Sequence, residues 1–110
     1  MTDLPAILSR LCELEPDRFA SNDEPYALLD GVLCYLPDDA AGHALLSAAL
    51  QELISEQDWS WARLIEGAVW IDGPANPHRH APISHAEPEG QPFALVLARA
   101  VIEALEATRG

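Results

Sequence analysis

The chain has 110 residues, of which 49% are hydrophobic and 6% aromatic, and its formal net charge is −12. This length fits a single domain spanning residues 1–110, with a core built mainly from aliphatic side chains. A negative charge of this size argues against direct binding of nucleic acid or of an anionic membrane, because both would repel it, and favours a basic protein as partner.

The predicted compartment is the cytoplasm. No stretch approaches the roughly 20 consecutive apolar residues of a membrane-spanning helix, and the first ten residues lack the basic start of a secretory signal. The two cysteines, Cys12 and Cys34, stand apart in apolar surroundings. We therefore expect reduced core residues rather than a disulfide.

The N-terminal quarter predicts a helix followed by a loop. Thr2 or Asp3 can cap a helix that has Pro5 in its first turn and continues at helical spacing to Leu14. Residues 15–25 are polar and contain two prolines, which is typical of a surface loop.

Residues 25–36 allow two interpretations. Apolar side chains from Tyr26 to Leu36 fit one face of a short helix, whereas Asp30-Gly31 between apolar arms is typical of a tight hairpin turn. We favour the helix and keep the hairpin as the alternative.

The next helix is predicted over residues 40–57, capped by Asp38 or Asp39. An apolar stripe follows one face of this segment. His43 lies on the opposite face, so we expect its side chain to be exposed to solvent.

Beyond residue 58 the apolar period changes from about 3.6 to about 2, which indicates strands. We expect strands at residues 59–64, 68–72 and 78–86. A helix from Pro92 to about Ala107 then completes the chain and is expected to be buried against the sheet. The fold class is therefore α+β, with a small antiparallel sheet of about three strands packed with three to four helices in layers.

Three of the four histidines, His78, His80 and His85, fall within eight residues. His78 and His80 share one face of a strand and could supply two metal ligands, but His85 points to the other face of an unbroken strand. We expect no metal and no other cofactor, with a polar edge strand whose Ala81 and Ile83 pack inward. A metal site at His78 and His80 is the minor alternative.

The sequence also lacks a phosphate-binding loop, the GxSxG and HExxH motifs and a clearly activated cysteine, so we expect no enzyme. Trp59, Trp61 and Trp70 are expected mainly in the core. The alternative is that one or more is exposed and anchors a partner or a second copy of the chain.

Residues 35–107 resemble the phage ABA sandwich domain family. The likeness rests on YLPDDAAGHALLSAALQEL, a tryptophan-bearing strand in AVWID, a further strand, and EGQPFALVLARAVIEAL. In that family a helix, a short antiparallel sheet and a C-terminal helix stack in layers, and the resemblance implies a phage or prophage setting without an established activity. The long DGPANPHRH connection and the extra N-terminal helix depart from the pattern.

We expect a non-enzymatic binding protein whose acidic N-terminal half docks on a basic surface, such as that of a nucleic-acid-binding complex. A nucleic-acid mimic of the anti-CRISPR kind would inhibit a host-defence complex in this way, since carboxylates can replace phosphates in a basic groove. The candidate partner-binding residues are eight acids within 27 positions. They are Glu13, Glu15, Asp17, Asp23, Glu24, Asp30, Asp38 and Asp39. The alternative is a structural or accessory phage protein that self-associates through its sheet, for example as a homodimer.

Overall fold

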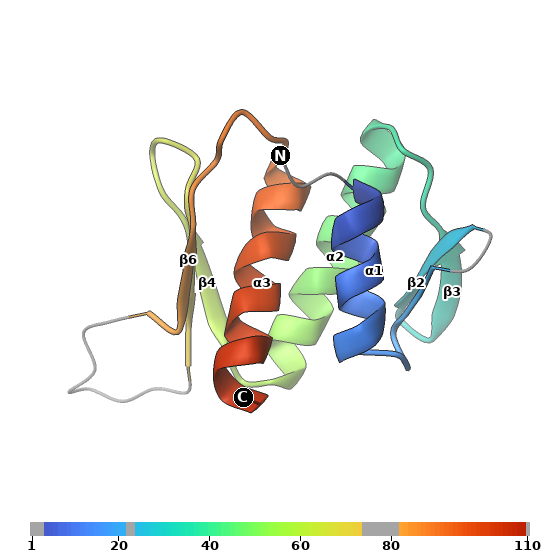
Figure 1. Cartoon of the computed structure of the whole chain (residues 1–110), viewed down its shortest axis with the longest axis horizontal. Helices are drawn as coiled ribbons and strands as arrows, with labels where there is room; N and C mark the ends of the chain where they lie inside the picture. The colour runs from blue at the N-terminus through green and yellow to red at the C-terminus, as the bar shows by residue number, and fades with distance from the viewer. Residues whose placement is uncertain (1–3, 22–23, 74–81, 110) are drawn as a thin grey trace.

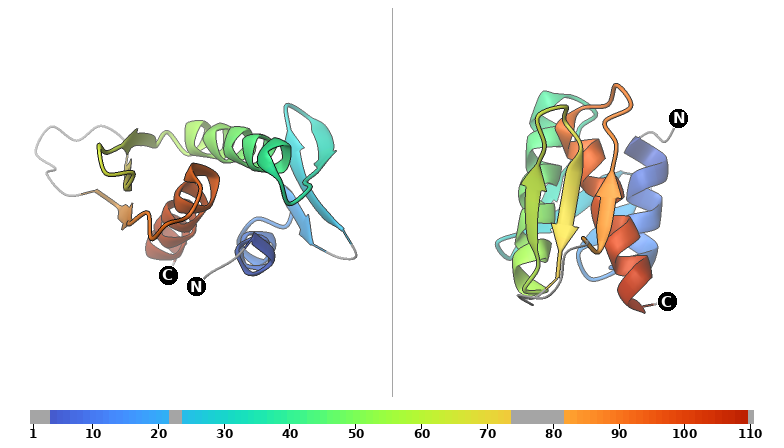
Figure 2. Two further views of the ribbon diagram at one scale, coloured as in Figure 1. Left: turned by 90° about the horizontal axis from the view of Figure 1, so that it is seen from above. Right: turned by 90° about the vertical axis from the view of Figure 1, so that its left-hand side faces the viewer.

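The computed structural model describes residues 4–21, 24–73 and 82–109. In this part of the chain, three helices form a layer between two three-stranded antiparallel sheets (Figures 1 and 2). The helices are α1 (Leu4–Leu14), α2 (Ala40–Glu56) and α3 (Phe93–Arg109). The N-terminal sheet contains β1 (Phe19–Ser21), β2 (Pro25–Leu29) and β3 (Val32–Tyr35), and the C-terminal sheet contains β4 (Ser60–Arg63), β5 (Val69–Asp72) and β6 (Ser84–Ala86).

All three helices run in the same direction, from the top to the bottom of Figure 1. For α2 and α3 the reason lies in the C-terminal sheet, because α2 is followed by a meander of three antiparallel strands that run along the helices (Figure 2). An odd number of such strands carries the chain back to the end where the preceding helix began. The next helix therefore starts there and points the same way.

The helix predicted at the start of the chain is confirmed as α1. It buries Leu4, Ile7, Leu8 and Leu11, which recur at helical spacing, against α3 and β1. The predicted loop over residues 15–25 is wrong in part, because it contains β1. This strand has three residues and forms by pairing with β2. So short a segment does not by itself indicate a strand.

The helix favoured for residues 25–36 is wrong, and the hairpin is present instead. Asp30 and Gly31 have φ values of 50° and 78°, which suit the two-residue turns that join twisted antiparallel strands. The register pairs Leu29 with Val32 directly across this turn. Asparagine, aspartate and glycine reach this left-handed region at the lowest energy. The turn preference of Asp30-Gly31 therefore outweighs the helical spacing of the apolar residues around it.

The helix predicted over residues 40–57 is confirmed as α2. Asp39 caps it, because the Asp39 Oδ1 accepts a hydrogen bond of 3.0 Å from the Gly42 N–H. Gly42 also lies against the chain that enters the helix: a Cβ at this position would stand 1.6 Å from the Pro37 carbonyl oxygen. Only glycine fits this approach without a shift of the backbone.

The C-terminal sheet confirms the strands predicted at residues 59–64 and 68–72. The third predicted strand is present at Ser84–Ala86, while residues 78–81 lie outside the described part of the chain. Ile83, just before this strand, packs against the core as expected, but the orientation predicted for the strand itself is wrong. Ser84 and Ala86 are buried and His85 is exposed, because β6 pairs with β5 in the register that brings Ser84 beside Ile71, whose side chain faces the helices.

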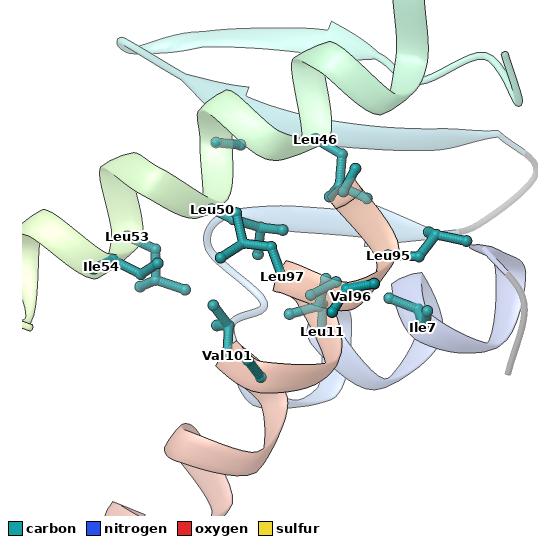
Figure 3. Close-up of a cluster of buried hydrophobic side chains, with 14 of the residues drawn as sticks. Ile7, Leu11, Leu46, Leu50, Leu53, Ile54, Leu95, Val96, Leu97 and Val101 are labelled. Carbon is teal, nitrogen blue, oxygen red and sulfur yellow. The ribbon is translucent and has the colours of Figure 1, made fainter. Parts of the chain in front are cut away.

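The core lies mainly between α2 and α3, where leucine, isoleucine and valine side chains of the two helices interdigitate (Figure 3). Nine residues of α3 are buried, which confirms that this helix is largely covered. The α+β class is thus as expected, with a second sheet added. Since α2 and α3 contact each other on the same side of the C-terminal sheet, the layers differ from the helix–sheet–helix order that the family resemblance implies. None of the described helices is both long enough and apolar enough to cross a membrane.

Candidate interaction surface

The outer face of the N-terminal sheet carries large apolar side chains. Phe19 and Ala27 are buried toward the helices, and side chains alternate along a strand, so Leu33 and Tyr35 point away from the core. Their exposed fractions are 58% and 48%. We call Tyr26, Leu28, Leu33 and Tyr35 the outer patch. An exposed apolar group of this kind on one sheet is typical of a protein–protein contact surface.

The two tyrosines give the outer patch a fixed shape. Tyr26 and Tyr35 are cross-strand partners, and their rings meet edge to face with centroids 5.8 Å apart. Such aromatic pairs stabilise antiparallel strands by up to about 1 kcal/mol. The patch is therefore held in place before any partner arrives.

Carboxylates lie at both ends of this hairpin. Glu24 precedes β2, and its Oε2 accepts a hydrogen bond of 2.8 Å from the Tyr26 hydroxyl. This hydrogen bond raises the pKa of Tyr26 above its ordinary value. Asp38 follows β3 at the same end, and Asp30 occupies the turn at the other end. We call Glu24, Asp30 and Asp38 the acidic rim.

Arginines neutralise other carboxylates but not the acidic rim. The ion pairs of arginine in the described chain are Arg10 with Glu13 and Glu106, Arg18 with Glu56, Arg99 with Glu89, and Arg109 with Glu15. Arg63 lies instead over the Phe93 ring, 5.0 Å from its centroid. Of the described arginines, none forms an ion pair with a rim carboxylate. The rim is thus a negative border that the described part of the molecule does not compensate with arginine.

The eight predicted partner-binding acids therefore separate into groups. Glu13 and Glu15 are paired with arginines, and Asp39 caps α2. Asp17 is exposed beyond the end of α1, and Asp23 lies outside the described residues. Glu24, Asp30 and Asp38 form the acidic rim. The structure does not bring the eight together as one array, and only the last three border an apolar surface.

The prediction for His43 is wrong. Its side chain is only 22% exposed, and its Nε2 lies 3.5 Å from the Asp38 Oδ1. The reason is that α3 begins beside it, so that Pro92 and Phe93 line the same recess as His43. The two free cysteines, Cys12 and Cys34, are half-buried and not joined.

The tryptophans confirm the main expectation and leave one exception. Trp59 is buried, and Trp61 packs on Phe93 with ring centroids 5.4 Å apart. Trp70 is 36% exposed on the outer face of the C-terminal sheet, where it meets the His85 ring edge to face at 6.0 Å. This second surface exposes a single large apolar side chain within its strands, so it is smaller than the outer patch.

The metal alternative at His78 and His80 falls on residues outside the described chain. Within the described residues, no group of three or more histidine, cysteine, aspartate or glutamate side chains is placed to hold a metal ion. His85 contacts Glu87, with its Nε2 3.4 Å from the Glu87 Oε1, on the exposed side of β6.

A recess of about 320 Å³ opens between the start of α1 and the N-terminal sheet. Leu4, Leu8 and Pro25 supply apolar lining, while Tyr35 and Asp38 connect it to the outer patch and the rim. Its size is at the lower limit of small-molecule sites, which combine an apolar lining with several convergent polar groups. Asp38 is the one charged side chain of its described lining, so the recess is better suited to an apolar side chain of a partner.

Sequence reasoning found the rim acids but missed the outer patch. The available signal was the pair Asp30-Gly31 between apolar arms, which predicts a hairpin and therefore places Leu33 and Tyr35 on one face. No protein family, curated protein or solved structure matches the chain.

Proposed function

We propose that this protein is a non-enzymatic binding protein that docks on a basic surface of another protein through the outer face of its N-terminal sheet. One observation carries the proposal: an exposed apolar patch ends on both sides in carboxylates that the described arginines leave unpaired. Binding surfaces commonly combine an apolar centre with a polar border. The patch supplies affinity, while the rim supplies association rate and selectivity for a basic partner.

The distribution of charge over the molecule supports the same partner. Residues 1–58 contain twelve carboxylates and two arginines, and they form α1, the N-terminal sheet and α2. Of these elements, α1 and the N-terminal sheet lie on the side of the molecule away from the C-terminal sheet, while α2 extends from one sheet to the other (Figures 1 and 2). A negative field on one side guides a positively charged protein toward that side.

A nucleic-acid mimic that blocks a host-defence complex is the narrower form of this proposal, and the family resemblance is its only support. Mimicry by charge alone needs a row of carboxylates, whereas the rim is small and surrounds an apolar centre. We therefore propose a mixed contact in which apolar burial and charge act together. The cytoplasm is the compartment that we propose, since both half-buried thiols persist unpaired in a reducing environment.

Self-association through this sheet fits less well than a basic partner. Two copies placed face to face would bring two acidic rims together around one patch. Like charges placed against each other across an interface are unfavourable, by several kcal/mol in close contact. We therefore expect a basic partner, and not a second copy of the chain, to bind the outer face of the N-terminal sheet.

The test is selection from a random peptide library on the immobilised protein, followed by affinity measurement. We expect the selected peptides to combine arginine or lysine with large apolar residues. Their affinity should fall between about 0.1 M and about 1 M salt, where the screening length decreases from about 10 Å to about 3 Å.

Two triple variants with equal net charge distinguish the effect of the rim carboxylates from the effect of the overall negative charge of the protein. Glu24→Gln, Asp30→Asn and Asp38→Asn together should weaken the selected peptides by about tenfold, because each exposed charge pair contributes up to about 1 kcal/mol. Asp58→Asn, Glu66→Gln and Glu103→Gln remove three exposed carboxylates elsewhere and should change affinity little. Equal effects of the two triples, or binding that salt does not weaken, would contradict the proposal.

A further inference from the structure

The outer patch continues into a free sheet edge. In the described chain β3 pairs with β2 alone and lies at the border of the N-terminal sheet. The Leu36 N–H donates a hydrogen bond of 2.9 Å to the Pro25 carbonyl. Leu36 and Pro25 are therefore a hydrogen-bonded pair, and this shows which residues of β3 turn their backbone groups toward β2. Because hydrogen-bonded pairs alternate along antiparallel strands, the N–H and C=O groups of Leu33 and Tyr35 point away from β2.

This edge lacks the features with which proteins block strand pairing. Proteins protect edges with charged residues, prolines or bulges. In the C-terminal sheet, β4 ends in Arg63 and β6 has a proline two residues beyond each end, whereas β3 has one only beyond its C-terminal end, Pro37. The sequence of β3 is Val-Leu-Cys-Tyr, with no charge and no proline. Its outward backbone groups belong to the same two residues, Leu33 and Tyr35, whose side chains are the most exposed in the outer patch.

We propose that an extended, basic segment of a partner protein adds to β3 as a further strand. Its backbone would pair with Leu33 and Tyr35, and its apolar side chains would extend the outer patch. Arginine or lysine at its two ends would meet Asp30 and Asp38, which stand beyond the two ends of β3. This inference rests on the proposed function, since it specifies how the basic partner is held. Strand addition supplies main-chain hydrogen bonds for affinity, while alternate side chains and end charges supply selectivity.

The charges at the ends of β3 select a basic segment over a second copy of the chain. An antiparallel pairing of β3 with its own copy would place Asp30 of one protomer near Asp38 of the other, at both ends of the pairing. Like charges across paired strands are destabilising. A segment with positive ends replaces both repulsions by attractions.

Three synthetic peptides test the proposal on the full chain. The first alternates valine and threonine between arginines at both ends, the second carries N-methyl groups on its valines, and the third has glutamate in place of arginine. The readout is amide hydrogen exchange by NMR. The arginine peptide should slow exchange of the Leu33 and Tyr35 amides by at least about tenfold, because a paired amide exchanges only after opening. The N-methylated and glutamate peptides should not.

A pair of protein variants provides the matched control. Leu33→Pro removes an N–H that points away from β2, so the ladder within the hairpin stays complete. Leu33→Thr keeps that N–H and also removes the leucine side chain. We expect the arginine peptide to bind Leu33→Thr at least about tenfold more tightly than Leu33→Pro, a difference of about 1.4 kcal/mol. If Leu33→Pro fails to fold, the N-methylated peptide still decides the question on the unchanged protein.

The outcomes separate this inference from the proposed function. Equal binding of the arginine peptide and its N-methylated form overturns strand addition while leaving a basic partner in place. Equal binding of the glutamate peptide overturns the basic partner itself. Failure of the arginine peptide to protect the two amides overturns strand addition. Protection that rises with protein concentration and needs no peptide assigns the edge to a second copy and overturns both.

Discussion

The Tyr26 hydroxyl donates a hydrogen bond to the Glu24 carboxylate over 2.8 Å, and this contact joins the outer patch to the acidic rim. It has two consequences, one for a partner and one for the tyrosine itself. The carboxylate is held beside the aromatic pair, so an arriving cation finds it in place. The tyrosine in turn stays protonated to higher pH than usual.

The ionisation of Tyr26 should therefore report this contact. In a Tyr35→Phe background Tyr26 is the only tyrosine, and its absorbance titration should give a pKa above the ordinary value of about 10. Adding Glu24→Gln should lower that pKa toward about 10, because the hydrogen bond to a carboxylate is its main cause. A raised folded-state pKa means that the contact stabilises the protein below about pH 10 and stops doing so as the pH rises through the raised value. An identical titration with and without Glu24 would refute the contact.

The cap of α2 makes a prediction about Asp39. Asp39→Ala should lower the free energy of unfolding by about 1 kcal/mol, because it leaves the Gly42 N–H without its side-chain acceptor. Asp39→Asn removes the same charge and keeps a capping oxygen, so it should cost much less. Urea denaturation measures both. If the two variants lose equal stability, charge and not capping explains the position.

Gly42→Ala should destabilise the protein although it lies in a helix. At an ordinary helical position this substitution stabilises by about 1 kcal/mol. Here the new Cβ would stand 1.6 Å from the Pro37 carbonyl oxygen, and overpacking of this kind costs about 1–3 kcal/mol. The reverse change at an exposed position, Ala44→Gly, provides the comparison and should cost about 1 kcal/mol from propensity alone. A gain in thermal stability for Gly42→Ala would show that the entry to α2 is looser than described.

Ser84 should connect β6 to α3. Its buried Oγ donates a hydrogen bond of 2.6 Å to the Ala100 carbonyl. Ser84→Ala should lower the free energy of unfolding by about 1 kcal/mol, the usual net contribution of such a bond. Ser60→Ala, at an exposed position of β4, should change it by less than about 0.5 kcal/mol. Equal denaturation midpoints for wild type and Ser84→Ala would argue against this connection.

The helices could be predicted because each buries one stripe of its surface. In α1 and α3 the spacing of buried residues matches the apolar spacing of the sequence, and the Asp39 cap marks the start of α2. The hairpin over residues 25–36 could not be settled in this way. Its apolar residues happen to recur at helical spacing, and Leu33 fits a buried helix face although the strand exposes it.

The composition of the sequence indicates an acidic site, but it does not show which acids belong to that site. The excess of acids in the first half is plain in the sequence, yet neutralisation depends on residues that are distant along the chain. Arg10 reaches Glu106, 96 positions away, and Arg109 reaches Glu15 from the last turn of α3. Which acids stay unpaired therefore follows only from the tertiary fold.

The shared direction of the three helices has an electrostatic consequence of its own. Peptide dipoles add along each helix, leaving about half a positive charge at its start and half a negative charge at its end. Because all three helices run the same way (Figure 1), like poles of α1, α2 and α3 gather at the same end of the helix layer instead of cancelling. The molecule thus has a permanent electric axis that crosses the line between its two sheets, so a charged protein approaching it experiences a torque as well as an attraction.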